Sequence, residues 1–322
     1  MSQTALVFPG QGAQKVGMGV DVADRWPAVK ATVYDRAAEV LGYDLLAICR
    51  EGPAEELVRT DIQQPAILAA GVACIEAAKA SGALAEDDVA VSLGLSLGEF
   101  TALQAAGALE LGVALLLVRE RGLGMQEASE ANPSGLTALR CEAEDAEAVC
   151  AAAREQTGGV CTVANLNAPG QVVISGDIPS LDAAEAIAKE RGIRRPTRLP
   201  VAGAFHSPLM QIGADRLAKA LDGIEIRTPR VPVISNVTGE ATTDPDTIRA
   251  NLVAQVTSPV LFMDCVRSAI GMGVTRVVES APGKVLTGLC RRIDADGKLT
   301  SLVNVDTAEA IEALGAAGEP SA

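Results

Sequence analysis

Short apolar segments alternate along this chain with segments that have the Ala- and Leu-rich spacing of helices. The apolar segments are mostly uninterrupted, which is typical of strands buried on both faces of a parallel sheet. They are TALVF (4–8), DVAVSL (88–93), VPVIS (231–235), RVVES (276–280) and SLVNV (301–305). The helical segments include 63–80, 97–108, 112–130, 207–222 and 283–293. This alternation predicts an α/β fold built on a parallel sheet.

The middle of the chain follows a different order. Its segments are a strand at 136–141, a helix at 142–156, strands at 160–165 and 171–176 around the turn residues NAPG (167–170), a helix at 180–192 and an extended edge at 193–201. Pro196 and Pro200 make that last segment unsuited to a central strand. The βαββαβ order is the ferredoxin-like pattern. We therefore predict an inserted subdomain at about 128–201, within a core formed by residues 1–127 and 202–322.

The sequence GLSLGEF at 94–100 places Ser96 in a G-x-S-x-G motif, directly after the strand-like segment 88–93 and before a helical one. In such a strand–turn–helix the glycines permit a sharp turn, and the serine Oγ is expected to stand exposed at the helix N-terminus. The alternative is a small residue in a tight turn. The context favours a nucleophile.

A serine hydroxyl is a weak nucleophile until a base takes its proton. The chain has one histidine, His206 in GAFHSPLM, so a histidine base for Ser96 has to be this residue. A lone histidine is more often an ordinary surface or core residue, and that alternative stays open here. A glycine-rich loop, FPGQGAQ (8–14), follows the first strand. It is either a plain β–α turn or a source of backbone N–H groups for an oxyanion, with the N–H of Leu97 as a second donor.

The charge and the cysteine content of the chain argue against several classes of partner and site. The formal net charge is −14, which disfavours nucleic acid and anionic lipid as partners unless a local basic patch exists. Seven scattered cysteines without a C-x-x-C motif, beside one histidine, predict buried reduced thiols in a cytoplasmic protein and no metal site. No apolar run approaches the roughly 18 residues of a membrane span. The N-terminal residues do not have the pattern of a secretory signal.

Eight strings in this order resemble the malonyl-CoA:acyl carrier protein transacylase family. They are FPGQGAQ (8–14), QPAIL (64–68), GLSLGEF (94–100), RGLGMQEA (121–128), NLNAPGQVVISG (165–176), AFHSPLM (204–210), SNVTG (235–239) and APGKVLTGL (281–289). The resemblance covers about residues 1 to 310. It implies an α/β-hydrolase-like core with a ferredoxin-like insert, and transfer of a malonyl group from malonyl-CoA to acyl carrier protein in fatty-acid synthesis. No cofactor is implied, and we expect a monomer.

The resemblance also implies roles for matching residues. They are Ser96 as the acyl-carrying nucleophile, His206 as the general base, Gln11 and Leu97 in the oxyanion hole, Arg121 as partner of the malonyl carboxylate, Asn167 and Gln255 as supports, and Phe205 as a residue typical of malonyl rather than branched substrates. The backbone carbonyl of Gln255 would orient the histidine, which leaves a dyad without a carboxylate. The family usually has histidine where this chain has Leu95, before the nucleophile. The G-x-S-x-G motif allows any residue at that position, so we expect Leu95 to leave the reaction at Ser96 unchanged.

The carrier protein that the resemblance implies is acidic, so a chain with this net charge needs a basic patch to bind it. Two clusters are candidates. One is RGIRRPTR, with Arg194 and Arg195 flanked by Arg191 and Arg198, and the other comprises Lys284, Arg291 and Arg292. Ordinary solvated side chains are the alternative.

Three other functions remain open at this point. A serine esterase or thioesterase shares the motif, and acidic residues between 97 and 205 leave room for its third catalytic group. A discrete acyltransferase that serves a polyketide synthase would have the same chemistry. A docking scaffold with a degenerate site, of which Leu95 would be a sign, is the non-enzymatic alternative.

Overall fold

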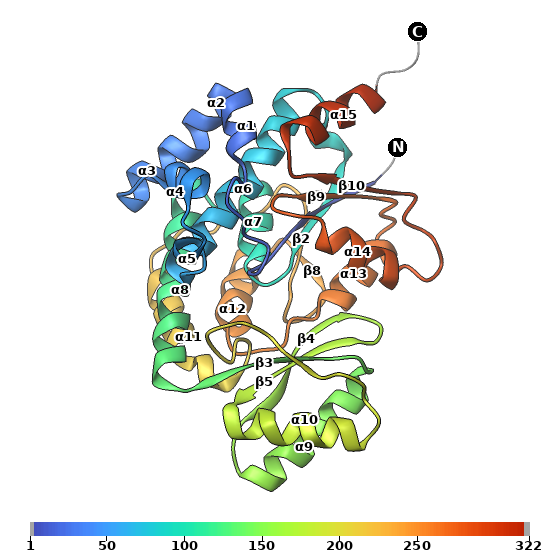
Figure 1. Cartoon of the computed structure of the whole chain (residues 1–322). Coiled ribbons are helices and arrows are strands. Elements are labelled where there is room, and N and C mark those ends of the chain that lie inside the picture. The colour runs from blue at the N-terminus through green and yellow to red at the C-terminus, as the bar shows by residue number, and fades with distance from the viewer. Residues whose placement is uncertain (1–2, 319–322) are drawn as a thin grey trace.

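The computed structural model describes residues 3–318, which form ten strands and a larger number of helices (Figure 1). The strands are β1 Thr4–Phe8, β2 Val89–Gly94, β3 Ser134–Leu139, β4 Cys161–Ala168, β5 Gln171–Asp177, β6 Thr197–Arg198, β7 Val233–Ile234, β8 Ala241–Thr242, β9 Arg276–Ser280 and β10 Ser301–Val305.

Most of the helices are α-helical. They are α1 Val20–Arg25, α2 Pro27–Val29, α3 Arg36–Leu41, α4 Leu45–Glu51, α5 Ala54–Leu57, α6 Thr60–Ala80, α7 Gly98–Ala105, α8 Leu111–Ala131, α9 Ala143–Thr157, α10 Ile178–Glu190, α11 Gln211–Leu221, α12 Pro245–Gln255, α13 Phe262–Gly271, α14 Val285–Ile293 and α15 Ala308–Gly318. A π-helical segment, η1 Lys30–Asp35, joins α2 to α3, and η2 Glu86–Asp88 and η3 Pro208–Met210 are 3₁₀ turns.

Six strands form the larger sheet, in the order β10-β9-β1-β2-β7-β8. All neighbouring pairs are parallel except β7 with β8, which are antiparallel. The predicted parallel α/β sheet is therefore confirmed, with a two-residue antiparallel strand at one edge that the sequence pattern did not reveal. The segment 231–235 contributes only Val233 and Ile234 to this sheet.

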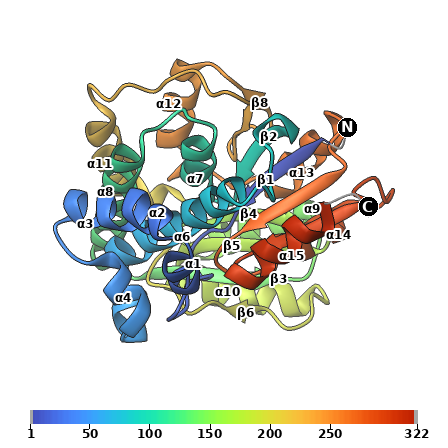
Figure 2. The same ribbon diagram turned by 90° about the horizontal axis from the view of Figure 1, so that it is seen from above.

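Both faces of the larger sheet are covered by helices, which is why its strands are apolar without alternation. On β1, Leu6 and Phe8 join the hydrophobic cluster that contains α6, α7 and α8. Ala5 and Val7 join the cluster on the other face, with α13 and α14. Figure 2 shows the sheet between these two sets of helices.

The smaller sheet is antiparallel, in the order β4-β5-β3-β6. The helices α9 and α10 cover one of its faces, at the lower end of the molecule in Figure 1. The βαββαβ order and ferredoxin-like topology are as predicted. Beside this sheet, Val260 exchanges backbone hydrogen bonds with Ala164 and Leu166 of β4, so β4 is also tied to the chain that precedes α13. The division at residues 128 and 201 stays a prediction.

Three predicted segments differ in length from the elements that the structure shows. In segment 193–201 only Thr197 and Arg198 pair as a strand. Residues 167 and 168 continue β4, so the turn before β5 is reduced to Pro169 and Gly170. The predicted helix 207–222 begins as a 3₁₀ turn and becomes α-helical at Gln211.

All seven cysteines lie within the described residues, and each is buried and free of a disulfide. Over residues 3–318, the structure has no helix with the length and apolar character needed to cross a membrane.

Candidate active site

The carboxyl ends of β1 and β2 meet at the turn that carries Ser96. Gly94 and Gly98 are required there, because a Cβ on Gly98 would lie 2.0 Å from the carbonyl oxygen of Phe8, and one on Gly94 2.0 Å from the carbonyl carbon of Gly98. Ser96 itself has φ 55°, a left-handed conformation that is unusual for a residue other than glycine. The expectation of an exposed serine is wrong: Ser96 is only 6% exposed, because other functional side chains lie over it.

His206 lies over Ser96 with its Nε2 2.8 Å from the serine Oγ. Its Nδ1 is 2.9 Å from the backbone carbonyl oxygen of Gln255. A carbonyl only accepts hydrogen bonds, so Nδ1 carries the ring proton and Nε2 is the acceptor for the Ser96 hydroxyl. The chain thus forms a Ser–His pair whose third member is a backbone carbonyl, and within the described residues no carboxylate contacts the imidazole.

The imidazole is held neutral. Burial, and after it the neighbouring positive charge of Arg121, lower the pKa of His206 to about 4, although backbone hydrogen bonds of Gln255 and Ser258 act in the opposite direction. A neutral imidazole at ordinary pH is ready to accept a proton.

Arg121 on α8 is completely buried, which is exceptional for an arginine. Its guanidinium donates to Gln64 Oε1 at 2.9 Å, to Ser96 Oγ at 2.9 Å and to Gln255 Oε1 at 3.1 Å. Its Nε has no hydrogen-bond partner among the described residues, and no carboxylate forms an ion pair with it there.

The pKa of Arg121 is lowered to about 10, because the effect of burial exceeds the opposing effect of the charge of Glu99. The guanidinium therefore stays charged at neutral pH. A buried cation whose own neighbours are mostly neutral amides is suited to receive a carboxylate from outside.

Three buried polar residues of the site were missed by the sequence interpretation: Gln64, Glu99 and Asn236. Each lies inside one of the eight strings that carry the family resemblance, but no sequence motif distinguished it from its neighbours as a site residue. Gln64 joins Arg121 to Gln11, since its Nε2 is 3.3 Å from Gln11 Oε1. Glu99 accepts a hydrogen bond from Gln255 Nε2 at 2.7 Å, and Asn236 contacts the backbone of Ser96.

The loop that carries Gln11 lies against the nucleophile turn. A Cβ on Gly10 would lie 2.6 Å from the carbonyl oxygen of Leu95, so this glycine permits the close approach. The Gln11 side chain is engaged with Gln63 and Gln64. Within the described residues, the backbone N–H groups of Gln11 and Leu97 donate no hydrogen bond, as an oxyanion hole requires. Their role stays a prediction.

Phe205 and Asn167 make no hydrogen bond with Ser96, His206 or Arg121 in the part of the chain that the structure describes. Phe205 is 8% exposed and belongs to the main hydrophobic cluster. The Oδ1 atom of Asn167 is buried without a partner among the same residues. Their roles also stay predictions.

In the first predicted docking cluster, the structure leaves fewer arginines with an uncompensated charge than the sequence suggested. Arg194 and Arg195 are exposed and form no ion pair with a described residue. Arg198 instead lies 2.8 Å from both Asp182 and Glu185, so its charge is largely compensated.

The second cluster lies on and beside α14. Lys284, Arg291 and Arg292 are all exposed. Arg292 donates to the backbone carbonyl of Pro169 at 2.6 Å and to Gln171, so it also ties α14 to the turn between β4 and β5.

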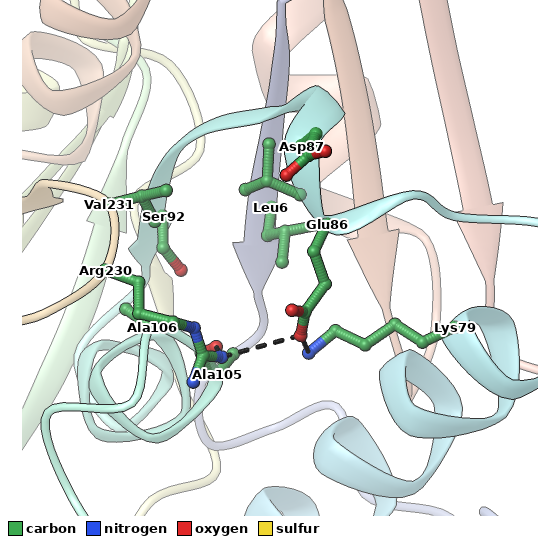
Figure 3. A pocket seen from close by; sticks show the side chains of 10 residues that line it. Leu6, Lys79, Glu86, Asp87, Ser92, Ala105, Ala106, Arg230 and Val231 are labelled. Carbon is green, nitrogen blue, oxygen red and sulfur yellow. Dashed lines mark hydrogen bonds and ion pairs between the residues drawn. The ribbon is translucent and has the colours of Figure 1, made fainter.

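A surface cavity of about 260 Å³ lies away from this site (Figure 3). Leu6, Ser92 and Val231 contribute to its lining, and Ser96, His206 and Arg121 do not. Its charges compensate one another, because Glu86 is 2.9 Å from Lys79 and 3.7 Å from Arg230. We assign no part of the chemistry to this cavity.

Comparison with known proteins agrees with this geometry. The family model "Acyl transferase domain" matches residues 5–305. The malonyl CoA-acyl carrier protein transacylase of Bacillus subtilis is 40% identical over 316 residues, which cover 98% of each chain. That of Escherichia coli K12 is 41% identical over 310 residues, which cover 96% of this chain and 98% of the relative.

Solved structures give the same result. An acyl carrier protein S-malonyltransferase from Vibrio cholerae is 41% identical with a TM-score of 0.90, covering 97% of this chain and 100% of that one. A malonyl-transacylase solved with its type II PKS acyl-carrier protein is 36% identical with a TM-score of 0.91, covering 98% of this chain and 100% of that one. The chain belongs to the acyl transferase domain family.

Proposed function

We propose that this protein is an S-malonyltransferase that moves a malonyl group from malonyl-CoA to the phosphopantetheine thiol of an acyl carrier protein, through an ester on Ser96. The single observation that carries the proposal is the position of Arg121. A buried guanidinium without an ion-pair partner among the described residues lies 2.9 Å from the Oγ of a serine that also contacts a neutral imidazole. This arrangement places a nucleophile directly beside a binding group for a free carboxylate.

The first half of the reaction loads the serine. His206 Nε2 takes the hydroxyl proton while Ser96 Oγ attacks the thioester carbonyl carbon. The negative charge on the carbonyl oxygen is stabilised by the backbone N–H groups of Gln11 and Leu97, each donor contributing about 10²–10³ in rate. The C–S bond then breaks, and the departing thiol of coenzyme A receives the proton from His206.

The second half repeats these steps with the carrier. Its thiol gives its proton to His206, and its sulfur attacks the malonyl ester. The C–O bond to Ser96 breaks, and the serine recovers its proton from His206. Ping-pong kinetics follow, because the first product leaves before the carrier thiol reacts.

Arg121 provides the selectivity. Two parallel hydrogen bonds from a guanidinium fit a carboxylate, so malonyl groups are held and uncharged acyl groups are not. The same contact positions the thioester beside Ser96. The ester has to survive until the carrier arrives, which the burial of Ser96, His206 and Arg121 supports by limiting water at the site.

The proposed steps use only these side chains and the two substrates, and no resident cofactor takes part. We further propose that the carrier binds at Arg194 and Arg195 or at the basic surface of α14, and that the protein works in the cytoplasm as a monomer. Carriers of fatty-acid and polyketide synthesis present the same thiol, so both fit this chemistry.

Intact-protein mass spectrometry after rapid mixing with malonyl-CoA tests the proposal. We expect a malonyl adduct on the wild-type protein and none on Ser96→Ala. Release of free malonate at the same rate with and without carrier would instead identify a hydrolase. No adduct on the wild-type protein would favour a docking scaffold.

A further inference from the structure

The amide side chain of Asn236 continues the pairing of β2 beyond the end of its neighbouring strand. β7 pairs with β2 in parallel at Val233 and Ile234, and there the strand ends. Two residues later, Asn236 Nδ2 donates to the carbonyl oxygen of Gly94 at 2.7 Å, and Asn236 Oδ1 accepts from the N–H of Ser96 at 2.6 Å. The side chain of Asn236 therefore makes the two hydrogen bonds that the backbone of a residue paired with Leu95 would make if β7 continued.

This contact acts on the residue with the most strained backbone of the turn. Ser96 has φ 55°, and a left-handed conformation costs a residue with a Cβ about 1–2 kcal/mol. Its N–H is held by Asn236, and its carbonyl oxygen accepts from Gln255 Nε2 at 3.0 Å. Both polar backbone groups of the nucleophile are thus fixed by side chains from distant parts of the chain.

Asn236 is itself fixed by its surroundings. Its backbone N–H donates to Glu99 Oε2 at 3.0 Å, and its carbonyl accepts from the N–H of Leu261 at 2.9 Å. The same Glu99 oxygen accepts from Gln255 Nε2 at 2.7 Å. Asn236 and Gln255 are completely buried and Glu99 is 3% exposed, so these hydrogen bonds do not compete with water.

We propose that Asn236 is a positioning residue, which holds the nucleophile turn in the conformation that aligns Ser96 Oγ with His206 Nε2. Glu99 supports it by fixing Asn236 and Gln255 together. The inference rests on the proposed role of Ser96 as the nucleophile. It assigns Asn236 no contact with substrate, so its loss slows the attack of Ser96 on every acyl donor equally.

The test measures the rate at which Ser96 is acylated in a single turnover. Asn236→Ala removes both hydrogen bonds and leaves the N–H of Ser96 without a partner. A misplacement of about 1 Å is sufficient to cost about 100-fold in rate, so we expect malonyl and acetyl donors to react about 10–100-fold more slowly, in an unchanged ratio. The affinity for malonyl-CoA and the acid limb of the pH profile are expected to stay as in the wild type.

A second variant keeps the test decisive if Asn236→Ala does not fold. Asn236→Asp retains an acceptor for the Ser96 N–H but loses the donor to Gly94, and we expect a smaller reduction in acylation. Ser180→Ala is the control, because Ser180 is also completely buried and hydrogen-bonded, to Thr157 in the smaller-sheet region. It should lower the melting temperature without slowing acylation.

The outcomes separate the two proposals. Failure of wild-type Ser96 to accept a malonyl group would refute the proposed function. A wild-type protein that is acylated, beside folded Asn236 variants that are acylated just as fast, would refute the positioning role alone. Loss of malonyl but not acetyl reactivity in Asn236→Ala would also refute it, because that result indicates a contact with the carboxylate.

Discussion

Replacement of Arg121 by alanine should change which acyl group this protein transfers. The side chain is completely buried and its guanidinium contacts Ser96, so a carboxylate bound there lies next to the nucleophile. Within the described residues no acidic side chain forms an ion pair with Arg121. The malonyl carboxylate would therefore lose its cationic partner entirely in the variant.

The size of the effect follows from two lost hydrogen bonds. Each hydrogen bond to a charged group contributes about 1.5–3 kcal/mol, so a bidentate contact contributes about 3–6 kcal/mol. Since 1.36 kcal/mol is a factor of ten in rate, kcat/KM for malonyl-CoA should fall by about 10²–10⁴. An acetyl group has no carboxylate, so kcat/KM for acetyl-CoA should hold or rise.

The assay follows transfer of radiolabelled malonyl and acetyl groups to purified carrier protein. Arg119→Ala is a matched control on the same helix, since Arg119 is only partly buried and donates to the backbone of Leu41 at 3.5 Å. It should leave both kcat/KM values close to wild type. An equal loss of malonyl and acetyl transfer in Arg121→Ala would refute the assignment, because it would mean that Arg121 serves only the fold or the serine.

Four further predictions concern the base and the carrier. His206→Gln should lower transfer by at least about 10³-fold, measured by the same assay, because the chain has no second histidine. With a pKa of about 4 for His206, wild-type kcat/KM for malonyl-CoA should be flat between about pH 5 and pH 7 and fall only near pH 4; a fall centred near pH 6.5 would contradict this. Between about pH 4 and pH 6.5 the unfolded chain binds a proton at His206 that the folded chain does not, so the free energy of unfolding decreases as the pH is lowered through this range. Lowering the pH from 7 to 5 should therefore reduce the free energy of unfolding of the wild type, measured with denaturant, by about 2 kcal/mol more than that of His206→Gln. Arg194→Glu combined with Arg195→Glu should raise the KM for carrier protein several-fold but not that for malonyl-CoA, whereas Arg227→Glu should change neither; a carrier KM that is unchanged and insensitive to salt would exclude this surface.

The fold could be predicted from the sequence because it depends on repeated patterns. The buried strands of the larger sheet and the βαββαβ order of the smaller one both leave a signal over many residues. The antiparallel strand β8 has only two residues and left no such signal. The contraction of segment 193–201 to Thr197 and Arg198 depends on which residues find a partner in β3, and that is decided by tertiary structure.

The site could be predicted where the choice of residues was narrow. One histidine and one G-x-S-x-G motif left a single Ser–His pair, and its atoms lie 2.8 Å apart. Glu99 and Asn236 could not be found in this way, because a buried polar residue is recognised by its hydrogen-bond partners, which come from elsewhere in the chain. The exposure of Ser96 was predicted wrongly for the same reason: Arg121 and His206 cover it from distant segments.

The network around Ser96 joins residues from seven separate segments, between Gln11 and Gln255. None of these segments forms the site alone, so refolding protein gains a reactive serine only after its most distant segments have met, and such contacts form slowly. Covalent labelling of Ser96 would therefore count correctly folded molecules. It would do so more strictly than a spectroscopic signal of helix content, which local segments already provide.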